Sequence, residues 1–118
     1  MVQVIDDPAT AYRRVALDAR VEGSDGAELT RLCLEQALAE IARARGATDL
    51  SRRTDALTRG AAALLALQEG VAPANPLRRA LVQFYGGVRA SLLGAIRSPG
   101  DAALAQAERD LAEVQALL

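Results

Sequence analysis

Apolar residues recur every three or four positions from residue 25 onward, which is the spacing of one face of an α-helix. In the segment "AELTRLCLEQALAEIARAR" this face consists of Leu29, Leu32, Cys33, Ala37, Ile41 and Ala44. Asp25 and Glu28 have the spacing of a capping box, and Gly46 follows the last apolar position. The pattern predicts a helix over residues 25–46.

The next apolar face follows "GATD", in which Asp49 is a candidate N-cap. A helix that stops at Gly70 is predicted here, because glycine is common just past a helix end. Its inner face is expected to hold Leu50, Leu57, Ala61, Leu64 and Leu65.

The stretch "GVAPANP" interrupts the helical pattern, because Pro73 prevents simple continuation. Asn75 and Pro76 have the form of an N-cap and a first-turn proline, so a further helix is predicted from there to about Arg97. The pair Gly86–Gly87 within it either permits close approach of another helix or marks a point where the helix bends. The apolar face of this helix consists of Leu77, Leu81, Phe84, Val88, Leu92 and Ala95.

Two more helical segments complete the pattern. "SPGD" opens a C-terminal helix with an apolar seam at Leu104, Ala107, Leu111, Val114 and Leu118. Near the start, Asp7 and Pro8 are a cap and a first-turn proline for a short helix that carries Tyr12, Val15 and Ala19 on one stripe. Short links between the segments predict an all-α fold, an antiparallel four-helix bundle with a short extra N-terminal helix. The 118 residues fit a single domain, residues 1–118.

The composition narrows the class of partner. A net charge of −1 and a pI near 5.4 give no broad attraction for nucleic acid or anionic lipid, so neither partner is expected. All 14 basic residues are arginine, which we interpret as genomic base-composition bias. "MVQVIDDPAT" carries acids where a signal peptide carries bases, and "AAALLAL" is too short to span a bilayer. We therefore expect a cytoplasmic protein without membrane insertion.

The residue types exclude most chemistry that a small helical bundle supports. The chain has no histidine, which excludes histidine phosphotransfer and the Glu-x-x-His pairs of di-iron bundles. Cys33 lies on an apolar stripe, where a thiol behaves as a small hydrophobe. Glu28, Glu35 and Glu40 fall on the polar side of their helix and are expected to be solvated. We expect no catalytic residue, metal site or cofactor, and protein binding becomes the leading class.

Two blocks resemble the FliS family, the cytoplasmic export chaperones of flagellin. "AYRRVALDARVEGSDGAEL" is similar to the family's opening, with its Ala-Tyr pair, short helix, polar turn and leucine. "ALVQFYGGVRASLLGA" is similar to its fourth-helix pattern, with Phe84 and Tyr85 on the Leu-Tyr positions. The chain departs from the family at 34–36, where an aromatic, Asp and Gly are usual, and at Gly86–Gly87, which replace an Asp-aromatic pair.

The resemblance implies a bundle that binds the disordered C-terminal segment of flagellin, prevents premature polymerisation and delivers flagellin to the flagellar type III export apparatus. Export-gate components or flagellar regulators are further partners it suggests. No cofactor or metal is implied. A FlaF-like chaperone, or another helical adaptor that sequesters a flagellar regulatory protein, is the alternative.

The resemblance also suggests roles for particular residues. A groove for the partner is expected at Leu29, Leu32, Gln36, Leu57, Leu64, Phe84 and Val88, although core packing explains each position equally well. Residues 1–22 are the implied lid over this groove, with Ala11, Tyr12 and Val15 as its contacts, and residues 25–118 the bundle. The alternative for Tyr12 is a permanent core contact.

Overall fold

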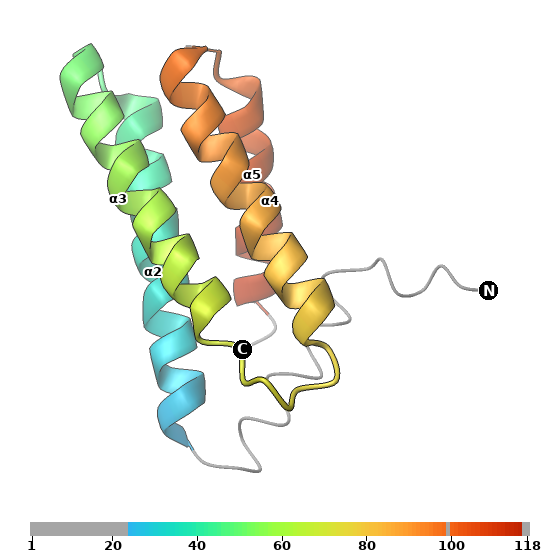
Figure 1. The fold of residues 1–118 in the computed structure, drawn as a ribbon. Helices are drawn as coiled ribbons and strands as arrows, with labels where there is room; N and C mark the ends of the chain where they lie inside the picture. The colour runs from blue at the N-terminus through green and yellow to red at the C-terminus, as the bar shows by residue number, and fades with distance from the viewer. Residues whose placement is uncertain (1–23, 99, 117–118) are drawn as a thin grey trace.

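A computed structural model describes residues 24–98 and 100–116 and contains four helices in these ranges. They are α2 (Ser24–Gly46), α3 (Leu50–Glu69), α4 (Arg78–Arg97) and α5 (Ala102–Gln115), and no strand occurs among the described residues. The helices run side by side, and each packs against two others (Figure 1). This confirms the all-α class, whereas the short N-terminal helix predicted within residues 1–22 lies outside the described residues.

The helix starts show which predicted caps form. Asp49 is the N-cap of α3, and its side chain accepts a hydrogen bond of 2.8 Å from the backbone N–H of Ser51. Asn75 does not cap α4, because the N-cap is Leu77. The Asn75 Oδ1 instead accepts the Leu77 N–H at 2.8 Å, within a turn that precedes the helix. That prediction was wrong by two residues, since the turn uses the side chain before the helix begins.

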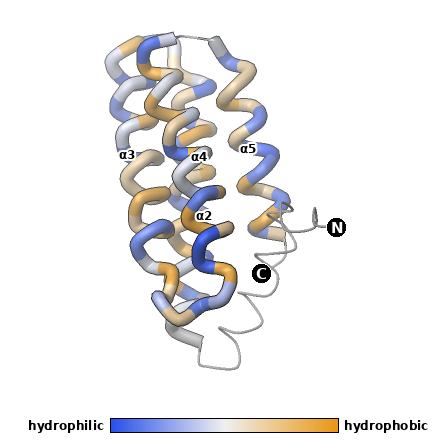
Figure 2. Tube along the Cα trace, turned by 45° about the vertical axis from the view of Figure 1, so that its right-hand side comes forward, coloured by the Kyte–Doolittle hydropathy of each residue, from blue (hydrophilic) through white to orange (hydrophobic). Residues whose placement is uncertain are grey.

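The core lies between the four helices. It contains Leu34, Ala37 and Ile41 from α2, Leu57, Leu64 and Leu67 from α3, Leu81, Tyr85 and Leu92 from α4, and Leu104, Leu111 and Val114 from α5. Each helix therefore has one apolar side and one polar side, as the alternating colours along the tubes in Figure 2 show. No helix in the described ranges is long and apolar enough to cross a membrane.

Two leucines assigned to the inner face of α3 lie on the surface. Leu50 is 66% exposed because it is the first residue of α3, at the end of the bundle. Leu65 is also exposed, whereas its neighbour Leu64 is fully buried. Successive residues on a helix point about 100° apart, so only one of such a pair faces the core.

Helix α4 continues without a break through Gly86–Gly87. A Cβ on Gly86 would lie 2.8 Å from Nε2 of Gln68, whose amide donates a hydrogen bond to the Val82 carbonyl across the α3–α4 interface. A Cβ on Gly87 would meet nothing within 4 Å. Close approach therefore applies at Gly86 alone, and neither glycine ends the helix.

The end of the bundle at the α2–α3 and α4–α5 connections is tied by arginines; we call it the closed end. Arg45 of α2 donates to Asp101 at 3.2 Å and also pairs with Glu108 of α5. The hydrogen bond to Asp101 is the main reason that the pKa of Arg45 is raised. Arg53 of α3 donates to the carbonyls of Ala95 and Gly100, at 3.3 Å each. All four helices are therefore connected at this end.

Candidate functional site

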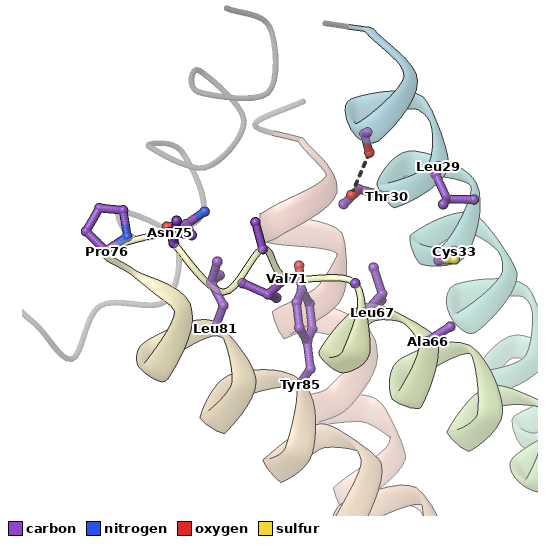
Figure 3. A pocket seen from close by; sticks show the side chains of 14 residues that line it. Leu29, Thr30, Cys33, Ala66, Leu67, Val71, Asn75, Pro76, Leu81 and Tyr85 are labelled. Carbon is purple, nitrogen blue, oxygen red and sulfur yellow. Dashed lines mark hydrogen bonds between the residues drawn. The ribbon is translucent and has the colours of Figure 1, made fainter. Parts of the chain in front are cut away.

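The opposite end, which we call the open end, contains a hollow of about 380 Å³. It lies between the first turns of α2, the last turns of α3, the connection at residues 70–77 and the start of α4 (Figure 3). We call it the end hollow. Its lining includes the side chains of Leu29, Cys33, Leu67, Val71, Leu81 and Tyr85.

Small residues explain why space remains here. Ala66, Ala72 and Ala74 line the end hollow, and their methyl groups cannot fill the gap between two helices and a loop. Val71 packs against the edge of the core, which holds the connection close to the bundle. Tyr85 is 2% exposed and closes the inner side with its ring (Figure 3). The hollow is therefore open to solvent at its rim and apolar inside.

Two polar side chains that line the end hollow form hydrogen bonds within their own segments. The Thr30 hydroxyl donates to the Gly26 carbonyl at 2.9 Å, and the Asn75 side chain accepts from Leu77. None of the described acidic or basic side chains lines it, and the same part of the chain contains no group of His, Cys, Asp or Glu that could hold a metal ion. Such a surface is suited to apolar contacts with a partner.

Three of the predicted groove residues lie on the exposed side of α2. Leu29 is at the rim of the end hollow and is 63% exposed, and Leu32 is 48% exposed. Gln36 is exposed one turn farther along, where its amide donates to Glu40 at 2.9 Å. These three residues form an exposed strip of α2 that leaves two large apolar side chains in contact with water.

The other four predicted groove residues lie elsewhere. Leu57 and Leu64 are fully buried in the core. Phe84 is half-buried and Val88 is buried, and both line a second hollow of about 470 Å³ between α4 and α5. The seven residues therefore do not share one surface in this structure. The predicted lid contacts Ala11, Tyr12 and Val15 lie outside the described residues.

Glu40 contradicts its predicted exposure. Glu28 and Glu35 are exposed as expected and pair with Arg31, but Glu40 is only 2% exposed. Glu40 lies against Gly60 of α3, where the absent side chain leaves room for it. The period of a helix places a residue on a side, but it does not reveal a neighbouring helix that covers that side.

Tyr85 is the buried aromatic residue that the predicted α4 stripe missed. It is the largest of the fully buried side chains, whereas the predicted Phe84 is half-buried. The two rings contact each other with centroids 5.5 Å apart. A stripe through Leu81, Tyr85, Val88 and Leu92 has the same helical spacing and would have identified the residue.

Comparisons with protein-family models, with curated proteins and with solved structures found no match to this chain. A proposal for its function therefore rests on its own residues, on the geometry of the open end and on the resemblance of its two sequence blocks to the FliS family.

Proposed function

We propose that this chain is a cytoplasmic export chaperone of flagellin. It binds the C-terminal segment of flagellin, prevents premature polymerisation and delivers flagellin to the flagellar type III export apparatus. The observation that carries the proposal is the position of Leu29 and Leu32. Both are exposed, Leu29 lines the end hollow, and both fall within or directly after the first block that resembles the FliS family.

The proposed binding mode follows from the shape of the open end. A disordered amphipathic segment folds into a helix as it binds, and places apolar side chains at i, i+3 and i+4 against a groove. The exposed α2 strip would cover one side of such a helix, and the end hollow would take one of its side chains. Each fully buried leucine contributes about 1.5–3 kcal/mol, so several contacts offset the cost of ordering the segment.

The proposal assigns different roles to the predicted groove residues. Leu29, Leu32 and Gln36 contact flagellin directly, because their side chains reach the surface. Leu57 and Leu64 support the groove from within the core. The resemblance implies that Ala11, Tyr12 and Val15 cover this strip until flagellin binds, and these residues lie outside the described ones. No catalytic step is required for this cycle.

The test is binding of the cognate flagellin C-terminal segment, measured by calorimetry with the full chain. We expect a one-to-one complex, and Leu29→Ser should raise Kd by about tenfold, which corresponds to about 1.4 kcal/mol of lost contact. Leu50→Ser is the matched control, because Leu50 is as exposed as Leu29 but lies at the closed end. Its Kd should equal that of the unmodified chain.

Two results would contradict this proposal. One is no binding at a chaperone concentration of tens of micromolar. The other is an equal loss of affinity in the Leu29→Ser and Leu50→Ser variants, since a loss that does not depend on position does not come from a contact at the open end.

A further inference from the structure

Small residues make up much of the buried side of α3. Four of its seven buried residues are Ala56, Gly60, Ala61 and Ala63, and the other three are leucines. Methyl groups offer little relief for interlocking, so the three leucines are the main apolar features that oppose a shift of α3 along α2. A polar feature that forms in one alignment only would strengthen this selection.

Glu40 and its partners supply that feature. The Oε2 atom of this buried carboxylate lies 3.1 Å from Nε of Arg59 on α3. The same atom accepts from Gln36 at 2.9 Å and lies 2.9 Å from Nη1 of Arg43, both on α2. Oε1 is buried and has no hydrogen-bond partner among the described residues. Arg59 is therefore the donor that ties the carboxylate to α3 in the described structure.

Gly60 makes the contact specific to one alignment. A Cβ at this position would lie 3.1 Å from Cδ1 of Leu92 and 3.4 Å from Cβ of Glu40. A shift of α3 by one turn moves it about 5.4 Å and would bring Ala56 or Ala63 opposite Glu40. The added methyl group would crowd this contact, and Arg59 would no longer reach the carboxylate.

We propose that Glu40, Arg59 and Gly60 form a register lock, which selects one alignment of α3 against α2 and thereby sets the shape of the end hollow. Buried charged groups are known to specify register even where they add little stability. Cys33 lies about two turns before Glu40 on the same side of α2, and it lines the end hollow together with Ala66 of α3. A change of alignment at the register lock therefore changes which residue faces Cys33.

Cys33 is the single cysteine in the sequence, so it can report this alignment. We would place a second cysteine by Ala62→Cys, Ala66→Cys or Glu69→Cys, at successive turns of α3, and measure the rate of disulfide formation under mild oxidation. Disulfides need Cβ atoms about 3.5–4.5 Å apart, so a one-turn offset is resolved. Cys33 should prefer position 66 over the better of the other two by about tenfold.

Glu40→Met removes the carboxylate and keeps a side chain of similar length. We expect the preference of Cys33 for position 66 to fall below about threefold, with a urea midpoint equal to or above that of the unmodified chain. Glu35→Met is the matched control, because it removes an exposed carboxylate from the same helix and should leave the preference unchanged. The proposal does not depend on any partner, since each measurement uses this chain alone.

Arg59→Met is the second variant, and it tests the register lock even if Glu40→Met does not fold. Arg59 is exposed, so its loss leaves the core intact while it removes the tie between the carboxylate and α3. A preference that stays at its original value in the folded variants would overturn the register lock. In that case Glu40 would be a packing contact and no more.

Discussion

The helices are held together by different kinds of contact at the two ends of the bundle. At the closed end, Arg45 and Arg53 reach from α2 and α3 to carboxylates and carbonyls of the α4–α5 half. At the open end, the polar side chains of Thr30 and Asn75 bond within their own segments, and small apolar residues leave a hollow. A long arginine side chain can form a hydrogen bond or ion pair across a gap between helices, whereas apolar side chains stabilise the fold only where they pack closely.

This difference separates the end that the arginines tie together from the end that we propose binds a partner. The closed end holds the four helices together by ion pairs and hydrogen bonds, and Leu50 is an exposed leucine there. The open end leaves Leu29 exposed beside a hollow, and the proposed partner would cover this side chain. Binding surfaces are commonly drawn from the less stable parts of a fold.

The largest effect on stability is expected from Tyr85→Ala at the open end. The ring is buried between the core and the end hollow, and its removal should cost about 3–5 kcal/mol in urea unfolding. Phe84→Ala is the control, because Phe84 is only half-buried and should cost about 1–2 kcal/mol. Equal costs would contradict the deeper burial of the Tyr85 ring.

A smaller effect is expected midway between the ends, from two glycines in helix interiors. Gly60→Ala places a methyl group against Leu92 and should destabilise the fold by about 1–3 kcal/mol. Gly87→Ala places it in open space and should stabilise α4 by about 0.5–1 kcal/mol through helix propensity. Urea midpoints that move in the same direction would refute the close contact at Gly60.

The smallest effect is expected at the closed end, from two aspartates at helix starts. Asp49→Ala removes the cap of α3 and should cost about 1 kcal/mol. Asp101→Ala should stay within about 0.5 kcal/mol, because Asp101 makes no cap bond to α5 and only a surface ion pair with Arg45. Thermal or urea unfolding separates the two, and a larger loss at Asp101 would mean that the arginine link dominates this end.

The helices were predictable because each carries a strong local signal. The period of the apolar residues, the cap at Asp49 and the break at "GVAPANP" gave the four described helices within a few residues of their observed bounds. The α5 seam from Leu104 to Val114 is buried as expected, because this helix has one side facing the bundle and one facing water.

The site was less predictable because it depends on which helices are neighbours. Leu57 and Leu64 have the helical spacing that residues of a binding groove would also have, and only the packing of the helices shows that they are buried. Glu40 looked like a solvated acid because Gly60, twenty positions away, gives no local sign that it will lie opposite. Pattern indicates the side of a helix, and tertiary contact decides what covers that side.

The order of contacts along the chain has a kinetic consequence. Helices α2, α3, α4 and α5 each pack on the next one in sequence, and only the α2–α5 contact joins the two extremes of the bundle. Such a low contact order favours folding in microseconds to milliseconds, since most loops to be closed are short. We expect the sequential hairpins to form first and α5 to dock on α2 last, which would make the Arg45 pairs a late event in folding.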